Sequence, residues 1–581
     1  MPPRRAFVPL LLLATLIVLP SCARPRPGIA PPPGAAAGAV ASAEPAATEA
    51  GLEILRRGGS AADAAVAVAL ALAVVHPHAG NLGGGGFAVV RQAGDLTTLD
   101  FRETAPAGST PGMFLDREGN PVPNASLLGP LAAGVPGSPA GLHELHRRFG
   151  RLPWRAVVEP AHRLARDGFT VTPRLSEAIG WSHDDLARFP ETTAVWLPGG
   201  DPPPAGTILR LPDLAATLAA YAAGGPGAIV SGPVADAVLA ASRRHGGILT
   251  AADLADYRPV WRPALRLQAY GWEIATMDLP SSGGIILGQT LKMFERLGWD
   301  RLPRGGAARA HLAAETWRRA YADRFLLGDV GNTRADAARL LDTAWIAARA
   351  EGIDRERATP SSSILPWPGA PPAGPAETTH LSVADAAGNV VALTTTLNGW
   401  FGCGLYVPGA GFFLNNEMDD FTTAPGRPNM FGLMQGEANL VKAGSRMLSS
   451  MTPVIAWRGD EVLALGSPGG SRIPTATAQV FLATVVDGDP LQAAVDRKRM
   501  HHQWLPDEIV LEPGALPAGA IAELRARGHP VRIMEDWFIG EVHAVRRRAD
   551  GTMEAAADAR GPGGAGVVEP VSAARAARSP R

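Results

Sequence analysis

Cysteine is nearly absent from this chain, which has 2 in 581 residues. Cys22 ends the N-terminal leader described below, so the rest of the chain has one cysteine and no pair for an internal disulfide. That residue, Cys403, lies in Phe401-Gly402-Cys403-Gly404, where it is expected to pack as a small hydrophobic side chain. A disulfide framework is therefore excluded.

An excess of charge of one sign is also missing. The 54 Lys and Arg residues balance 55 Asp and Glu residues, and no block of like charge stands out. Because nucleic-acid binding relies on basic groups that neutralise phosphates, nucleic acid is not expected as a partner. Hydrophobic residues make up 46% of the chain, and Gly and Pro together stay below the roughly 25–30% typical of disorder, so a large globular core is expected.

Several common catalytic signatures do not occur: G-x-S-x-G, S-x-x-K, H-E-x-x-H and the Walker loop. The paired histidines His76/His78 and His501/His502 have no carboxylate or cysteine nearby at metal-ligand spacing, so no metal site is expected. The glycine run 83–86 follows a predicted helix and precedes a predicted strand at 87–91. That order is the reverse of a dinucleotide-binding loop, which is rejected.

The first 22 residues are interpreted as a targeting segment outside the fold. Arg4 and Arg5 precede an apolar run, Leu10 to Leu19, that is too short for the about 20 residues a membrane-spanning helix needs. Leu19-Pro20-Ser21-Cys22 resembles a bacterial lipoprotein signal, with cleavage before Cys22 and lipid on its thiol; an ordinary secretory peptide is the alternative. Residues 23–40 would be a Pro/Ala-rich tether, and the expected location is the periplasm or cell envelope.

The remaining chain mixes helices with short strands, which indicates an α/β layered fold. Residues 46–57 and 61–75 are predicted helices separated by Gly58-Gly59-Ser60, and the second is apolar on all sides, as a buried helix is. Helices are predicted to dominate 140–260 and 304–352, and short strands are predicted at 379–397, 411–414, 453–458 and 461–466. The Ala/Arg/Pro-rich tail after Gly561 is expected to be disordered.

The most informative segment is Glu377-Thr378-Thr379-His380-Leu381-Ser382, which follows the Pro-rich stretch 359–376. Residues 379–384 and 390–397 are predicted to form a hairpin whose turn is centred on Ala387. In that register Thr378 lies opposite Thr396, close enough for the two side chains to hydrogen-bond. Taken alone, such a pair is a cross-strand contact.

Other motifs surround this hairpin in order. After it come Asn398, Asn415-Asn416-Glu417-Met418-Asp419-Asp420, Leu448-Ser449-Ser450-Met451 and Gly466-Ser467-Pro468-Gly469-Gly470-Ser471-Arg472; before it come Gly83-Gly84-Gly85-Gly86-Phe87, Asp100-Phe101-Arg102-Glu103-Thr104-Ala105-Pro106, Gly134-Val135-Pro136-Gly137, Asp253-Leu254-Ala255-Asp256-Tyr257 and Pro280-Ser281-Ser282-Gly283-Gly284. From about Ala41 to about Arg560, the set resembles the γ-glutamyltranspeptidase (glutathione hydrolase) family of N-terminal-nucleophile hydrolases. The resemblance implies an αββα sandwich, with two facing sheets between helical layers, and no cofactor.

The resemblance also implies that the precursor cuts its own backbone between Glu377 and Thr378. The products would be a large subunit, residues 41–377, and a small subunit, residues 378–581, which form a heterodimer. A threonine hydroxyl is a poor nucleophile, and the freed α-amine, with a pKa near 8, supplies a base on the same residue. Thr379 is the adjacent rival, but the family's T-T-H pattern puts the nucleophile first.

The other catalytic roles follow from the same pattern. Thr396 would hydrogen-bond Thr378 and orient it. Gly469 and Gly470 would offer backbone N–H groups to the developing oxyanion, since glycine lets the backbone approach closely.

Substrate binding is implied for a second set of residues. Arg102 would hold an α-carboxylate through the two-pronged geometry of its guanidinium group. Ser449 and Ser450 would donate hydrogen bonds to that carboxylate. The groups that would accept from the α-ammonium are Asn398, Glu417 and Asp420.

Residues Pro425 to Gly436 resemble the lid loop over the pocket. Phe431 stands where some members have a gating tyrosine, and it lacks the hydroxyl that bonds across the pocket. Acceptor selectivity is therefore left open.

The implied function is that of a γ-glutamyltransferase/glutathione hydrolase, which expels Cys-Gly from glutathione and passes the γ-glutamyl group to water, an amino acid or a peptide. One alternative is an acylase of the same family that acts on glutaryl cephalosporins. Asp420 argues against it, because members turned towards cephalosporin side chains tend to lack this residue. The other alternative is an unprocessed lipoprotein that binds γ-glutamyl peptides without turnover.

Overall fold

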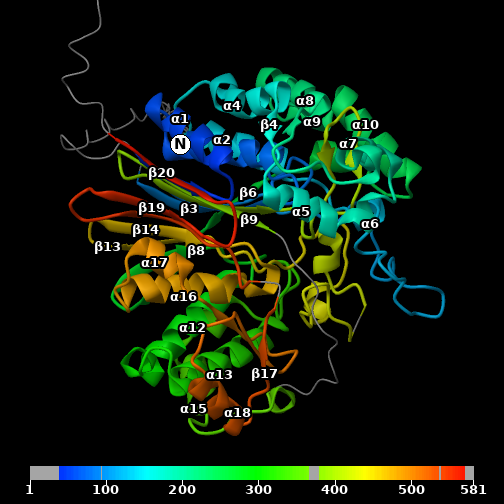
Figure 1. The fold of residues 1–581 in the computed structure, drawn as a ribbon. Coiled ribbons are helices and arrows are strands. Elements are labelled where there is room, and N and C mark those ends of the chain that lie inside the picture. Colours follow the sequence, from blue (N-terminus) through cyan, green and yellow to red (C-terminus); the bar gives the residue numbers. More distant parts are fainter. Residues whose placement is uncertain (1–37, 93, 365–377, 425, 536–537, 570–581) are drawn as a thin grey trace, which may run out of the picture.

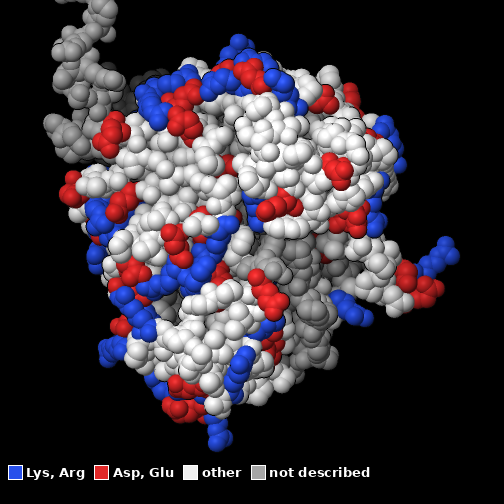
Figure 2. All heavy atoms as spheres, in the orientation of Figure 1, with Lys and Arg blue, Asp and Glu red and all other residues white. Residues whose placement is uncertain are grey.

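Two facing β-sheets lie between two layers of helices (Figure 1). The computed structural model describes residues 38–92, 94–364, 378–424, 426–535 and 538–569. The αββα sandwich implied by the sequence is confirmed. Basic and acidic side chains are interspersed on the face drawn in Figure 2, in line with the net charge of −1.

The first sheet carries the hairpin. Its strand order is β20 (Gly564–Val568), β1 (Gly38–Ser42), β9 (Thr379–Asp385), β10 (Val390–Thr396), β2 (Gly85–Gln92), β3 (Asp95–Asp100) and β6 (Val260–Pro263). Thr395 pairs with Thr379, as the predicted register requires, so Thr378 lies opposite Thr396 at the end of the ladder. The glycine run lets β2 lie close to β10: a Cβ on Gly84 would stand 2.1 Å from the carbonyl oxygen of Thr396.

The second sheet has the order β19 (Met553–Ala557), β18 (His543–Arg547), β14 (Glu461–Gly466), β13 (Val454–Arg458), β8 (Trp272–Thr276) and β7 (Leu265–Ala269). Small apolar side chains fill the space between the sheets, among them Ala41, Ala275, Ala392 and Ala464. Because alanine takes little room, the two sheets pack closely in this region.

One helical layer covers the first sheet (Figure 1). Its central helix, α2 (Ala61–Val75), is buried along its whole length, and a capping box formed by Ser60 and Asp63 starts it, so the prediction of a buried helix is confirmed. The other helices of the region 45–256 are α1 (Pro45–Arg56), α3 (Ser138–Phe149), α4 (Trp154–Asp167), α5 (Pro173–Trp181), α6 (His183–Leu186), α7 (Pro190–Trp196), α8 (Pro212–Gly224), α9 (Gly227–Val230), α10 (Gly232–Arg244) and α11 (Ala251–Asp256).

The other layer contains α12 (Gly283–Leu297), α13 (Ala307–Arg324), α16 (Ile473–Val485) and α17 (Leu491–Asp496) (Figure 1). The shorter α14 (Ala337–Leu340), α15 (Thr343–Glu351) and α18 (Ala518–Ala526) and a small sheet of β15 (Met500–His501), β16 (Ile509–Leu511) and β17 (Val531–Ile533) complete this side. The helical prediction for 304–352 is confirmed by α13, α14 and α15, which are separated by irregular residues at 325–336 and 341–342.

Two expectations about the chain after Thr378 are corrected. The sequence predicts strands and turns there, but α16 is a buried helix of 13 residues. Residues 564–568, expected to be disordered, form strand β20, which pairs with β1; residues 570–581 lie outside the described residues. β1 itself takes in residues 38–40, the last three of the expected tether. Pairing between the two ends of a chain leaves no local signal, which is why both strands were missed.

Within the described ranges, no helix combines the length and the apolar character needed to cross a bilayer. The leader expected over residues 1–22 lies outside those ranges.

Candidate active site

Thr378 is the first described residue after the gap at 365–377 and is 4% exposed. Its hydroxyl donates to Oγ1 of Thr396 at 3.4 Å, and that oxygen also accepts the backbone N–H of Asn398 at 2.8 Å. The second bond fixes the Thr396 side chain, so Thr378 meets an oriented partner. Glu377 lies outside the described residues.

Thr378 lines a small cavity, called the Thr378 cavity below, and a glycine turn lies against it. Gly470 lines it together with Thr378, whereas Gly469 precedes it in the turn and is not part of the lining. Gly469 has φ +124 and Gly470 has φ +55, backbone conformations that glycine adopts most readily. Helix α16 starts three residues later, so the turn stands at the positive end of a helix dipole. Such a place favours a developing negative charge.

Arg102 lies in the extended segment after β3 and is 1% exposed. Its Nη1 pairs with Oε1 of Glu417, and its Nη2 lies 2.5 Å from Oδ2 of Asp420. Glu103 stands further off, with Oε2 3.8 Å from Nη1. Three buried carboxylates therefore face one guanidinium group.

This crowding changes the ionisation of the acids. Burial raises the pKa of Glu417 and of Asp420, and Arg102 opposes the rise in both. Burial also raises the pKa of Glu103 to about 7, again against the effect of Arg102. Like charges in one buried site resist simultaneous ionisation, so an added positive group would stabilise the ionised carboxylates of this cluster.

Two hydroxyls line the same cavity as Arg102. Ser449 and Ser450 both line the cavity, and Oγ of Ser449 accepts the backbone N–H of Met451 at 3.0 Å, which leaves its own proton free to donate. Within the described chain, Oγ of Ser450 and Oε2 of Glu417 are buried without a hydrogen-bond partner. Because unpaired buried polar atoms are costly, these atoms are suited to bind a polar ligand.

Asn398 occupies a strained position at the edge of the cavity. Its φ is +77, in the region that favours glycine. Its Nδ2 donates to the carbonyl oxygen of Asn416 at 3.0 Å and approaches Sδ of Met430 at 3.6 Å. The side-chain oxygen remains available for an ammonium group.

The segment expected to be a lid is tied down over the cavity. Pro425 lies outside the described residues; Phe431 lines the cavity and is 4% exposed. Asn429 Nδ2 donates to Oδ1 of Asp420 at 2.9 Å, and the N–H of Met430 donates to Oδ2 of Asp419 at 2.8 Å. This segment is thus held by the same acidic run that meets Arg102.

Gly436 ends this segment away from the cavity, where its carbonyl oxygen accepts the Thr422 hydroxyl at 2.7 Å. Asp419, which holds the Met430 amide, was not predicted as a site residue. Its place in the acidic run was the one available signal.

The Thr378 cavity has little free space, about 10 Å³, which is barely the room one water requires, about 10–15 Å³. It is lined by Arg102, Thr378, Thr396, Asn398, Glu417, Asp420, Phe431, Ser449, Ser450, Met451, Gly470 and Ile473. The structure thus brings together all the predicted catalytic and substrate-binding residues except Gly469, which is next to the lining. Met451 and Ile473 were not predicted.

An open groove of about 440 Å³ adjoins this cavity, lined among others by Trp181, Trp400, Asn416 and Met430. We call it the Trp400 groove. The Trp181 and Trp400 rings stack with centroids 4.9 Å apart. Asn398, which lines the cavity, contacts both Asn416 and Met430 of the groove, so the two spaces are neighbours.

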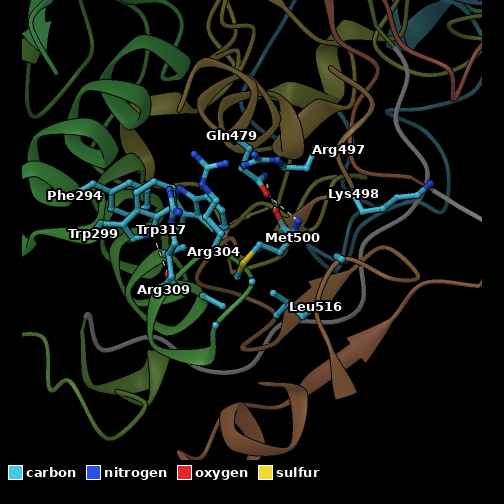
Figure 3. A pocket seen from close by; sticks show the side chains of 15 residues that line it. Phe294, Trp299, Arg304, Arg309, Trp317, Gln479, Arg497, Lys498, Met500 and Leu516 are labelled. Carbon is cyan, nitrogen blue, oxygen red and sulfur yellow. Dashed lines mark hydrogen bonds between the residues drawn. The ribbon is translucent and has the colours of Figure 1, made fainter. Parts of the chain in front are cut away.

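A separate hollow of about 110 Å³ lies between α12, α13 and α16 (Figure 3). Its aromatic side includes Phe294 and Trp299, which stack at 4.6 Å. The arginines at its rim are paired with acids: Asp487 contacts Arg309 at 2.8 Å and Arg497 at 2.5 Å. It shares no lining residue with the Thr378 cavity, and none of the described Ser, Thr, Cys, Asp or Glu residues lines it.

The histidine pairs are held in separate contacts. His76 Nδ1 lies 3.3 Å from Glu44, and His501 hydrogen-bonds Thr475 and Gln503 at 2.8 and 2.9 Å. A third group with the spacing of metal ligands, His311, Glu315 and His529, was not predicted. There Nδ1 of His311 bonds Nε2 of His529 at 2.7 Å, and Glu315 pairs with Arg318 and Arg319, so these groups already satisfy one another.

Comparisons with known proteins converge on one family. A family model described as gamma-glutamyltranspeptidase matches residues 47–568. The glutathione hydrolase proenzyme of Escherichia coli (strain K12) is 40% identical over 527 residues, 90% of each chain, and that of Pseudomonas aeruginosa is 41% identical over 92% of this chain and 95% of the relative. The structure of a cephalosporin acylase from Bacillus halodurans is similar with a TM-score of 0.81 at 26% identity, covering 95% of this chain and 99% of that one. The family match, over residues 47–568, spans every residue that lines the Thr378 cavity.

Proposed function

The chain belongs to the γ-glutamyltranspeptidase family, and from that premise we propose that it is a γ-glutamyltransferase/glutathione hydrolase whose nucleophile is Thr378. The observation that carries the proposal is a buried site for a zwitterion beside this threonine. Arg102, Ser449 and Ser450 offer positive charge and donors, and Glu417, Asp420 and Asn398 offer acceptors. An amino-acid head group presents the matching pair, an α-carboxylate and an α-ammonium.

Charge balance favours a γ-glutamyl donor over a glutaryl one. A zwitterion adds no net charge, and its ammonium relieves the repulsion among the acids that face Arg102. A glutaryl group brings a further carboxylate without an ammonium, so it adds negative charge to a cluster in which Glu417 and Asp420 already share Arg102. The acylase alternative is therefore the weaker of the two.

The reaction follows from this placement. The head group binds at Arg102 and leaves the γ-carbonyl near Thr378, whose hydroxyl attacks while its α-amine takes the proton. Backbone N–H groups of the Gly469–Gly470 turn, at the start of α16, stabilise the oxyanion. Collapse breaks the amide bond, and the ammonium returns the proton to the leaving amine. Water or an amine then attacks the γ-glutamyl ester and frees Thr378.

Maturation is proposed to use the same hydroxyl. The Thr378 hydroxyl attacks the carbonyl carbon of Glu377, and the C–N bond breaks so that an ester replaces the peptide bond and the α-amine is freed. Water then hydrolyses the ester, which releases the Glu377 carboxylate and restores the Thr378 hydroxyl. Both products would stay together, because β9 and β10 of the small subunit pair with β1 and β2 of the large subunit. The proposed partner of each fragment is thus the other half of its own sheet.

The Trp400 groove is proposed to receive the leaving Cys-Gly and the incoming amino acid or peptide. Its volume of about 440 Å³ suits a dipeptide, and it adjoins the cavity at Asn398. Donor and acceptor would then meet at Thr378 from opposite sides.

The function is tested with purified wild-type protein. We expect release of p-nitroaniline from γ-glutamyl-p-nitroanilide, much slower turnover of glutaryl-cephalosporin, and two bands on a denaturing gel. Preference for the glutaryl substrate would support the acylase alternative, and one uncut band with tight binding but no turnover would support the binding protein.

Phe431→Tyr tests the lid. Phe431 and Asn398 line the same cavity, so a tyrosine hydroxyl could donate to the Asn398 side-chain oxygen, a bond worth about 0.5–1.5 kcal/mol net. A better-closed lid excludes water, so the ratio of transfer to hydrolysis at fixed glycylglycine should rise by about two- to tenfold. Phe431→Leu, which adds no hydroxyl, is the control and should not raise it. An unchanged ratio in a normally matured Tyr variant would show that position 431 does not control water access.

Export to the periplasm or cell envelope through residues 1–22, with lipid attached to Cys22, is proposed from the sequence of the leader. Metabolic labelling with a fatty acid would separate wild type from Cys22→Ala. Equal labelling of the two would contradict the lipid anchor.

A further inference from the structure

Arg324 is a buried cation whose hydrogen-bond acceptors among the described residues are all uncharged. It is the last residue of α13 and is 2% exposed. Its three nitrogens donate to neutral acceptors: Oγ of Ser282 at 3.1 Å, Oε1 of Gln435 at 3.1 Å and the carbonyl oxygen of Leu448 at 3.3 Å. Among the described residues, no carboxylate lies within 4.0 Å of its guanidinium group. A buried charge held this way is costly and calls for an explanation.

Each acceptor is one bond away from the binding groups of the Thr378 cavity. Ser282 donates through Oγ and N–H to the carbonyl oxygen of Ser449, at 2.7 and 2.9 Å. Gln435 donates from Nε2 to the carbonyl oxygen of Asp420 at 2.9 Å. Leu448 directly precedes the two serines. Arg324 therefore connects the carboxylate-binding serines with the ammonium-binding acid.

Charge adds to this connection. Burial lowers the pKa of Arg324 to about 10, partly offset by Asp420, so the side chain stays protonated at neutral pH. Burial raises the pKa of Asp420, and Arg102 and then Arg324 oppose the rise. The other charged groups near Asp420 are Glu103, Glu417 and Asp419, all acidic. Arg324 is thus the second cation in a cluster dominated by acids.

We propose that Arg324 is a positioning residue for donor binding, which sets the spacing between Ser449–Ser450 and Asp420 and supplies a positive charge behind Asp420. The inference rests on the proposed function, because it assigns the two ends of the spacing to the α-carboxylate and the α-ammonium. Arg324 does not line the cavity and does not touch the reacting atoms. It should therefore affect binding of the head group more than the chemical step.

The test compares Arg324→Gln, Arg324→Lys and a matched control, Arg319→Gln. Arg319 is also buried on α13, but its partners are Glu315 and the carbonyl oxygen of Gly352. The readouts are KM and kcat for γ-glutamyl-p-nitroanilide, the inhibition constant of L-glutamate as a function of pH, the melting temperature and the extent of self-cleavage.

Arg324→Gln is expected to raise both KM and the glutamate inhibition constant at least about tenfold, since three charge-assisted bonds are lost, while kcat stays within about threefold. Loss of the cation lets the pKa of Asp420 rise, so binding should fail at a higher pH than in wild type as the solution is acidified. Arg324→Lys keeps the charge but not the three-pronged geometry. Its affinity for glutamate should therefore be intermediate, and the pH below which glutamate binding fails should be that of wild type. Arg319→Gln should have a lower melting temperature than wild type but the same affinity for glutamate.

Wild-type affinity in Arg324→Gln, or an equal loss of affinity in Arg319→Gln, would overturn the positioning role. If glutamate binding by Arg324→Gln fails at the same acidic pH as in wild type, the proposed effect of the Arg324 charge on Asp420 would be overturned. If Arg324→Gln does not mature, Arg324→Lys decides, and a wild-type inhibition constant there overturns the proposal. Wild-type protein that does not hydrolyse γ-glutamyl-p-nitroanilide would count against the proposed function instead.

Discussion

Thr378→Ala is expected to remain one uncut chain and to lose at least about three orders of magnitude of γ-glutamyl-p-nitroanilide hydrolysis. The change removes the hydroxyl that is proposed to cut the Glu377–Thr378 bond, and with it the later nucleophile. Without the cut the α-amine stays in a peptide bond, so the base is lost as well. A denaturing gel and a p-nitroaniline assay measure the two effects separately.

Thr379→Ala is the matched control. Thr379 is the adjacent threonine, and successive side chains of a strand point to opposite faces, so its hydroxyl is directed away from Thr396. This variant should mature, and its small subunit should begin Thr-Ala-His-Leu, as the wild-type one begins Thr-Thr-His-Leu. A cut Thr378→Ala chain, or a different first residue in the wild-type fragment, would refute the assignment of the nucleophile.

Arg102→Lys is expected to lower kcat/KM for the γ-glutamyl donor about 100-fold, chiefly through KM. Lysine keeps the charge that faces Glu417 and Asp420 but cannot present two parallel donors to a carboxylate. Self-cleavage should survive, because the head-group site takes no part in it. Kinetics on the matured variant and a denaturing gel provide the measurement.

Arg446→Lys gives the matched control for this prediction. Arg446 is buried in the same neighbourhood, where it lies 3.2 Å from Asp100 and donates to the carbonyl oxygen of Arg102, but it does not line the Thr378 cavity. It should cost stability and leave KM nearly unchanged. Equal KM values for Arg102→Lys and wild type would reduce Arg102 to a structural ion-pair residue.

The parts of the fold that sequence could predict are those with a local signal. The turn at Ala387 fixes the hairpin register, because strand side chains alternate with a period of two residues and a slip of one would reverse every face. Helix α2 is recognisable from an uninterrupted Ala/Val run that starts at a serine cap. Residues Arg102, Glu417 and Ser450 came from the family resemblance; spacing alone does not bring together groups more than 300 positions apart.

What could not be predicted depends on distant contacts. β20 forms because β1, near the other end of the chain, offers it an edge. The α16 segment is apolar on nearly every side and lacks the periodicity that reveals a surface helix, although Pro474 at its start was a usable signal. Arg324 looks in sequence like any other arginine of an Arg-rich helix. Its role depends on the segments that its guanidinium group contacts, at Ser282, Gln435 and Leu448.

The strand order of the first sheet bears on whether the mature protein can refold once it has unfolded. β9 and β10, which follow Thr378, lie at its centre between β1 and β2, which precede Thr378, so after the proposed cut neither piece would hold a complete sheet. The connection that guided the chain into this order during folding is then gone, and recovery from unfolding would require two separate pieces to find each other. The stability of the mature protein would therefore be kinetic: it would be set by the rate of unfolding rather than by a folding equilibrium. On this proposal, the cut that activates the protein would also make its unfolding hard to reverse.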